Sequence, residues 1–232
     1  MLDPLRPVRH GRLLHSGDGG CRPTRGSSAH PRAHPEVTRL KRTLVLASSS
    51  AIRQKLMAHL GLEFMSARPV YIERDLALPP EEESLAHARG KVESVASQFL
   101  DSIIIGSDQL LFWAGERHRK PMNEPEVIAQ LLELRGIEHH LFTSLVVRDM
   151  LRQETLEHVV DSTLVVDGAL TERQIRRYAR QDTPVGCAGG YRLEGLGISL
   201  FSRISSSDAS AILGMPMMAL CRFLRDFGIS IP

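Results

Sequence analysis

The stretch TLVLASSSAIRQKLMAHLG, residues 43–61, decides the fold class. It opens with an apolar run, passes through three serines and continues with a helical pattern that closes at Gly61. This order predicts a buried strand, a polar turn and a helix over residues 51–60. The ordered part of the chain therefore begins with the strand and helix of an α/β protein.

The same alternation continues to the C-terminus. Further helices are expected over residues 81–99, 124–134, 171–181 (with Thr171 as N-cap) and 215–228. Further strands are expected over residues 101–109, 140–149, 158–168 and 197–205, the second and third of these as a hairpin. Residues 115–121 are expected to form a turn and a loop, and His139 and His140 to lie on a turn. Interleaved strands and helices predict a layered α/β domain.

Charge is distributed unevenly along the 232 residues, although the net charge is only +2. Residues 1–42 hold nine Lys and Arg against three Asp and Glu, with many Pro, Gly and Ser. Such a segment buries too little apolar surface to offset its ordering entropy, so we expect a disordered basic extension over residues 1–42 and one domain over residues 43–232.

Several classes of protein are excluded by composition. No apolar run is long enough to span a bilayer, so no membrane role is expected. The three cysteines form no CxxC pair, which argues against a disulfide framework or zinc cluster and favours the cytoplasm. Neither a GxGxxG fingerprint nor a P-loop occurs, so these two modes of nucleotide binding are excluded.

Reactive side chains follow the first expected strand. Ser48 and Ser50 precede the first helix and Arg53 lies one turn inside it. Free N–H groups, hydroxyls and a guanidinium at a helix start suit a phosphate group. The same residues also fit a simple N-cap serine with a solvated arginine.

A second group of candidates follows the strand that contains Ile103–Ile105. Asp108 stands where that strand is expected to end, and a carboxylate there could hold a divalent cation, activate water or only cap a turn. Lys91 and Lys120 offer positive charge for a phosphate or are solvated surface lysines. Gly195 and Gly197 suggest a backbone that approaches another group closely, such as a planar base.

Four strings in register resemble the Maf-like nucleotide pyrophosphatases: LASSSAIRQ (residues 46–54), IIIGSDQ (103–109), RKP (119–121) and CAGGYRLEGLGISLFSRI (187–204), the last followed by LGMP. The resemblance extends from about Thr43 to the C-terminus. It is strongest to the 7-methyl-GTP branch, on Gln109 and Glu194.

The resemblance implies hydrolysis of a nucleoside triphosphate to the nucleoside monophosphate and inorganic diphosphate. It implies a mixed sheet flanked by helices, with two lobes around a nucleotide cleft, as in Maf and ITPase proteins. Asp108 matches the proton acceptor and, with Glu73, a metal-binding position for Mg²⁺ or Mn²⁺. Arg53, Lys91 and Lys120 match basic positions that hold the triphosphate.

Base preference is assigned by the same resemblance to Ile52, Gln109 and Glu194. Several residues depart from the family pattern, among them Ile52, where this branch tends to have tryptophan, Gly90, where glutamate is usual, and Ser210, where asparagine is common. N7-methylation gives guanine a positive charge, which the carboxylate of Glu194 could compensate.

Three alternatives remain open at the level of sequence. The chemistry could be the same with dTTP or UTP, or the chain could be a nucleotide-binding regulator of septation with vestigial activity. Nucleic-acid binding through the basic segment is disfavoured because that segment lacks interleaved aromatic residues. The expected partner is a small nucleotide, and a homodimer is left open.

Overall fold

A computed structural model describes residues 42–231. Seven strands and six α-helices are assigned within these residues, together with two short 3-10 helices. Their bounds are β1 Leu44–Ala47, α1 Ala51–Ala58, β2 Met65–Ala67, α2 Pro80–Ala96, β3 Ile103–Trp113, β4 Glu116–His118, α3 Glu124–Glu133, β5 Glu138–Asp149, β6 Glu154–Val166, α4 Glu172–Asp182, η1 Ala188–Gly190, η2 Leu196–Leu200, β7 Phe201–Ser205, α5 Ala209–Ile212 and α6 Met217–Asp226.

One mixed sheet runs through residues 42–231, in the order β2-β1-β3-β5-β6-β7. Strands β1, β2 and β3 are parallel, while β5 pairs antiparallel with both β3 and β6. The long hairpin of β5 and β6 confirms the expected one, with β5 beginning two residues and β6 four residues earlier than expected and β6 ending two residues earlier. The expected mixed α/β sheet flanked by helices is thereby confirmed.

Strand β3 has a gap along the edge that faces β1. Its first three residues pair with β1, and its last three pair with the short strand β4. Between them, from Gly106 to Leu110, this edge of β3 has no neighbouring strand in the sheet, although the other edge stays paired with β5. The backbone is therefore open in the middle of the sheet, at the point where Asp108 lies.

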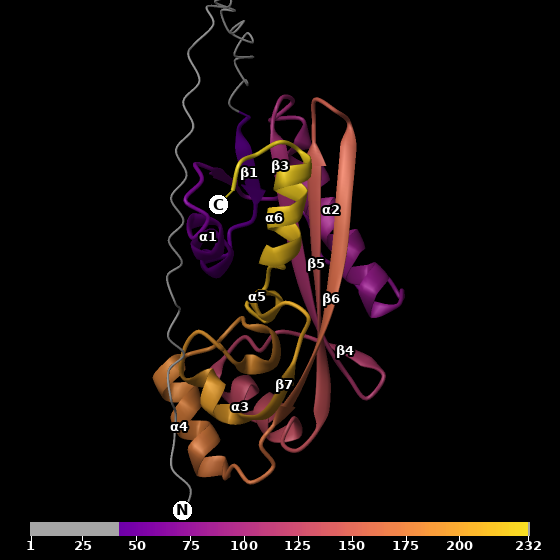
Figure 1. Cartoon of the computed structure of the whole chain (residues 1–232). Coiled ribbons are helices and arrows are strands. Elements are labelled where there is room, and N and C mark those ends of the chain that lie inside the picture. The colour runs from indigo at the N-terminus through magenta and orange to yellow at the C-terminus, as the bar shows by residue number, and fades with distance from the viewer. Residues whose placement is uncertain (1–41, 232) are drawn as a thin grey trace, which may run out of the picture. The chain divides into compact units, whose positions relative to one another are not determined.

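Three apolar clusters hold the helices on the sheet. Helices α1 and α6 cover one face of β1, β3 and β5, and α2 covers the opposite face (Figure 1). The third cluster lies at the other end of the long strands, where α3 and α4 pack on the far halves of β3, β5 and β6. Two lobes result, and both contain parts of β3, β5 and β6.

The helices are predicted well from sequence. The first four predicted helices begin within one residue of α1, α2, α3 and α4, and the fifth contains α6. Thr171 caps α4 with a full capping box, in which its hydroxyl accepts from the Gln174 N–H and Gln174 reaches back. No helix among residues 42–231 is both long and apolar enough to cross a membrane.

Several local predictions are wrong. Residues 116–118 form strand β4 instead of a turn and loop, because they pair with the end of β3. The expected strand over residues 197–205 is a 3-10 helix up to Leu200 and a strand only from Phe201. Strand β2 was not predicted at all. Arg42, assigned to the extension, forms an ion pair with the buried Asp149, so the folded part includes it. The rest of the predicted extension lies outside the described residues.

His139 and His140 lie in strand β5 and not on a turn. Successive side chains of a strand point to opposite faces of the sheet, so the two histidines do so as well. His139 is fully buried, with its Nε2 3.0 Å from the hydroxyl of Tyr191, and burial lowers its pKa to about 4. His140 is partly exposed and pairs with Asp161. His139 is therefore a neutral core histidine, consistent with a structural role.

Candidate active site

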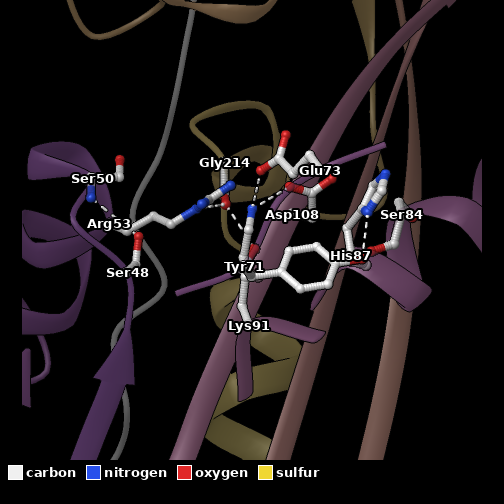
Figure 2. Close-up of polar contacts among 12 residues, drawn as sticks. Ser48, Ser50, Arg53, Tyr71, Glu73, Ser84, His87, Lys91, Asp108 and Gly214 are labelled. Atoms are coloured by element: carbon white, nitrogen blue, oxygen red, sulfur yellow. Dashed lines mark hydrogen bonds and ion pairs between the residues drawn. The ribbon is translucent and has the colours of Figure 1, made fainter. Parts of the chain in front are cut away.

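Asp108 is the centre of a buried charge cluster in the gap along β3. Its side chain points towards α2, where the Lys91 ammonium lies 2.5 Å from Asp108 Oδ1. The same ammonium lies 2.6 Å from Oε1 of Glu73, which comes from the segment before α2 (Figure 2). Asp108 is in the middle of a strand and does not cap a turn, contrary to one of its sequence interpretations.

Opposing effects act on the ionisation of Asp108. Burial by itself raises the pKa of the carboxyl, but the charges of Lys91 and Arg53 outweigh burial, so the pKa lies below its ordinary value. Its second oxygen, Oδ2, is buried without a hydrogen-bond partner in the described structure. The site therefore contains a carboxylate that stays ionised and keeps one acceptor oxygen free.

Arg53 is held beneath the same cluster. Its guanidinium is buried, and its Nε donates to the carbonyl oxygen of Gly214 at 2.7 Å. Burial lowers its pKa, while Asp108 and Glu73 act in the opposite direction. A solvated arginine is thus excluded. The buried hydroxyl of Ser48 accepts from the N–H of Ser50, the N-cap of α1, whose own hydroxyl makes no capping bond.

Lys120 completes the set of cations from the loop after β4. The residue keeps exposed surface, but its ammonium is desolvated, which together with repulsion from Arg53 lowers its pKa. Attraction to Asp108 acts in the opposite direction. Lys91 and Lys120 therefore both lie close to the cluster, and neither is an isolated surface lysine.

A cavity of about 280 Å³ adjoins the cluster and gathers most of the remaining candidates. Six predicted residues line it: Ser50, Ile52, Arg53, Gln109, Lys120 and Glu194. They come from both lobes: three from the start of α1, Gln109 from β3, Lys120 from the loop after β4, and Glu194 from the segment between η1 and η2. Ile52 therefore lies at the wall of this cavity. The sequence thus predicts a group of residues that the fold brings together.

Gln109 is oriented by protein contacts on its amide nitrogen. Nε2 lies within 3.1 Å of the Thr143 hydroxyl and of two carbonyl oxygens of α5, those of Ala211 and Ile212. These acceptors fix the amide so that Oε1 is left for the cavity. The cavity consequently receives an acceptor from Gln109 rather than a donor.

Glu194 is already paired in this cavity. Arg192 Nε lies 3.2 Å from its Oε1, and this hydrogen bond raises the pKa of Arg192. Both side chains are about one third exposed, so the pair is weak and open to competition. Gly195 and Gly197 make close approaches within the chain, to Asp182 and to the Arg192 backbone.

Comparisons with known proteins show the family of this chain. Residues 43–227 match the model of the family described as Maf-like protein. The chain belongs to the Maf-like family. A relative from Xanthomonas axonopodis pv. citri named 7-methyl-GTP pyrophosphatase is 39% identical, covering 82% of this chain and 98% of its own length. A relative of the same name from Syntrophotalea carbinolica is 38% identical, covering 81% and 96%.

Among solved structures the likeness of this Maf-like chain is weak. A nucleoside-triphosphatase, or dITP/XTP pyrophosphatase, from Mycobacterium abscessus matches with a TM-score of 0.36 and 14% identity, covering 56% of this chain and 76% of that one. The assignment to the family therefore comes from the family model and the curated relatives.

The donors of the Maf-like site suit a small divalent cation bound together with substrate. Among residues 42–231 no group of three or more His, Cys, Asp or Glu could hold a metal ion alone. Glu73 and Asp108, however, converge on one ammonium, and Asp108 Oδ2 is an unsatisfied acceptor. Two carboxylates plus phosphate oxygens are a common ligand set for Mg²⁺. The residues present thus fit such an ion.

Sequence reasoning missed four polar residues next to this cluster: Tyr71, Glu83, His87 and Arg117. They form a connected network between α2, β4 and the segment that carries Glu73. Only the spacing of Glu83 and His87, four residues apart on one helix, could have indicated a contact. The contacts of Tyr71 and Arg117 join residues that are 16 and 34 positions apart in the sequence, and no local pattern reveals such contacts.

Proposed function

We propose that this chain hydrolyses 7-methyl-GTP, or a related modified nucleotide, between its α and β phosphates. The observation that carries the proposal is the ionised, buried Asp108 within a cluster of cations beside a cavity lined by Gln109 and Glu194. The curated relatives that carry the name 7-methyl-GTP pyrophosphatase support the choice of base.

In this proposal Asp108 accepts a proton from the water that attacks the α-phosphorus. The bond from that phosphorus to the oxygen that bridges the α and β phosphates breaks. The products are the nucleoside monophosphate and inorganic diphosphate. Asp108 suits the role because Lys91 and Arg53 keep it ionised and Oδ2 is free to accept. Arg53 and Lys120, with the Ser48–Ser50 turn, bind phosphate oxygens and offset the developing negative charge.

A bound Mg²⁺ or Mn²⁺ would neutralise phosphate charge and orient the phosphates. Glu73 and Asp108 would hold it, because their carboxylates already converge on the Lys91 ammonium. Lys91 then has two tasks in the proposed site: it keeps Asp108 ionised and holds the Glu73 carboxylate beside it.

Base preference in this proposal depends on Glu194 and Gln109. Guanine presents its N1–H and N2–H₂ donors, and both side chains offer acceptor oxygens to the cavity. The positive charge of the methylated base competes with Arg192 for Glu194. Arg192 therefore reduces the discrimination that Glu194 provides, and the two residues act in opposite directions.

The Glu194→Gln variant should lose preference for the methylated base. We expect its ratio of kcat/KM for 7-methyl-GTP over GTP to fall roughly tenfold, because one charge-assisted contact is lost. Arg192→Gln is the matched variant and should raise the same ratio. Steady-state kinetics with both nucleotides measures this, and a ratio that neither substitution changes would remove Glu194 from the specificity assignment.

The function itself is tested by pyrophosphate release from 7-methyl-GTP, GTP, dTTP, UTP and CTP, with Mg²⁺, Mn²⁺ or chelator. Metal-dependent turnover that favours 7-methyl-GTP is expected. Turnover that favours dTTP or UTP would keep the reaction and reject the assignment of the base. Absence of turnover with every nucleotide, despite binding, would reject the enzyme and favour a nucleotide-binding regulator.

A further inference from the structure

The segment that carries Glu73 has no regular structure of its own. It runs from residue 68 to residue 79, between β2 and α2, and every residue from 72 to 79 is exposed. No backbone ladder or apolar packing therefore fixes Glu73 next to Asp108. Its position must come from a few specific side-chain contacts.

Tyr71 provides the first of these contacts, two residues before Glu73. Its hydroxyl lies 3.0 Å from Nδ1 of His87, which is fully buried on α2 (Figure 2). The two rings meet edge to face, with centroids 5.8 Å apart. Burial, together with the charges of Asp108 and Glu73, raises the pKa of Tyr71, so its hydroxyl stays protonated.

Gly90 makes room for the tyrosine ring. A Cβ at this position would lie 2.1 Å from Cε2 of Tyr71, which is closer than atoms can approach. A glycine inside a helix costs roughly 0.5–1 kcal/mol relative to alanine, so its presence in α2 needs a reason. Gly90 immediately precedes Lys91, and the ring of Tyr71 thus packs on the turn of α2 that bears the ammonium.

His87 is in turn oriented by Glu83 and Arg117. Its Nε2 lies 3.2 Å from Glu83 Oε1 and 3.3 Å from Nη1 of Arg117, while its Nδ1 faces the Tyr71 hydroxyl. Arg117 pairs with the buried Glu83 and also donates to the carbonyl oxygen of Arg74 at 3.3 Å. Residues 71 and 74 are thereby held on both sides of Glu73.

We propose that Tyr71 is a positioning residue that sets Glu73 for metal binding, and that Gly90 is matched to it by admitting its ring. The inference rests on the metal role that the proposed function gives to Glu73. Tyr71 acts through Glu73 and through the segment that both belong to. The hydroxyl fixes the segment to His87, and the ring fixes it to the turn of Lys91.

Binding of Mn²⁺ to the protein saturated with a non-hydrolysable nucleotide analogue tests this role without relying on turnover. Electron paramagnetic resonance gives the Kd of the wild-type chain, of Tyr71→Phe and of Glu73→Gln as the reference. Tyr71→Phe should weaken binding roughly tenfold, in the range of residues that orient metal ligands. Its thermal unfolding is measured alongside, so that a loss of fold is not taken for a loss of positioning.

A double-variant cycle tests the match between Tyr71 and Gly90. Gly90→Ala alone should weaken Mn²⁺ binding at least as much as Tyr71→Phe, because the new Cβ displaces the ring. The same substitution in a Tyr71→Ala background should have no further effect, because the clash is gone. Effects that simply add, or a defect of Gly90→Ala that persists without Tyr71, would overturn the matched pair.

Failure of this inference is distinct from failure of the proposed function. If Tyr71→Phe binds Mn²⁺ with the wild-type Kd while Glu73→Gln binds it more weakly, the positioning role is rejected. This holds even if the enzyme turns over 7-methyl-GTP. Mn²⁺ binding by the wild-type chain that does not depend on Glu73 also overturns it. A chain that releases no pyrophosphate yet loses Mn²⁺ affinity in Tyr71→Phe keeps the inference and rejects the function.

Discussion

The Asp108→Asn variant should lose turnover of 7-methyl-GTP by roughly 1,000-fold, the usual contribution of a positioned general base. Asparagine keeps the shape of the side chain but cannot accept the proton of the attacking water. The fold should survive, because the substitution removes a buried negative charge while Lys91 retains Glu73 as its partner. Steady-state pyrophosphate release measures the change in kcat.

The matched control is Asp161→Asn, an exposed carboxylate on β6 that pairs with His140. It should turn over like the wild-type chain. Calorimetry with a non-hydrolysable analogue should show that Asp108→Asn still binds nucleotide. Comparable kcat values for Asp108→Asn and the wild type would move the proton acceptor elsewhere, and loss of binding alone would assign Asp108 to substrate binding.

Lys91→Met should destabilise the protein by about 3 kcal/mol at neutral pH, because removing one partner of a buried pair leaves an uncompensated charge. Lys91 and Asp108 are both buried, and methionine fills a similar volume. Turnover should also fall, since the cation that keeps Asp108 ionised is gone. Urea denaturation measures the stability, and the double variant with Asp108→Asn should recover most of it.

The pH dependence has a defined sign. In the wild type the folded pKa of Asp108 is lowered, so its stabilisation is present above the unfolded value of about 3.9 and is lost as the pH falls through the folded value. In Lys91→Met the folded pKa of Asp108 should be higher than in the wild type, because the charge that lowers it most is gone. Its stability deficit should then shrink as the pH falls, and an equal deficit at neutral and acidic pH would contradict the expectation.

The sequence predicts those helices and strands whose formation depends mainly on residues close to them in the chain. The helix over residues 171–181 was predictable because its capping residue and its apolar spacing agree. Strand β4 was not, since it exists only because the end of β3 offers a partner. Residues 197–200 have the apolar pattern of a strand but belong to a 3-10 helix, because an apolar run does not distinguish the two.

In the candidate site, too, some features follow from local sequence and others only from contacts between distant segments. Arg53, Asp108 and Lys120 carry reactive groups in recognisable strings, and the fold does bring them together. The pairing of Lys91 with both carboxylates depends on burial, which no string encodes. The Arg192 partner of Glu194 lies only two residues away, yet its effect on Glu194 became visible only with the ion pair.

The continuous pairing of β3 with β5, from residue 103 to residue 112, affects how the two lobes can move. The ladder of hydrogen bonds crosses from one lobe to the other without a break, and β6 continues it on the next strand. A hinge between the lobes would have to bend this sheet. Rotation of one lobe against the other is therefore a poor route to closure, and adjustment around a nucleotide is left to side chains and to the segment before α2.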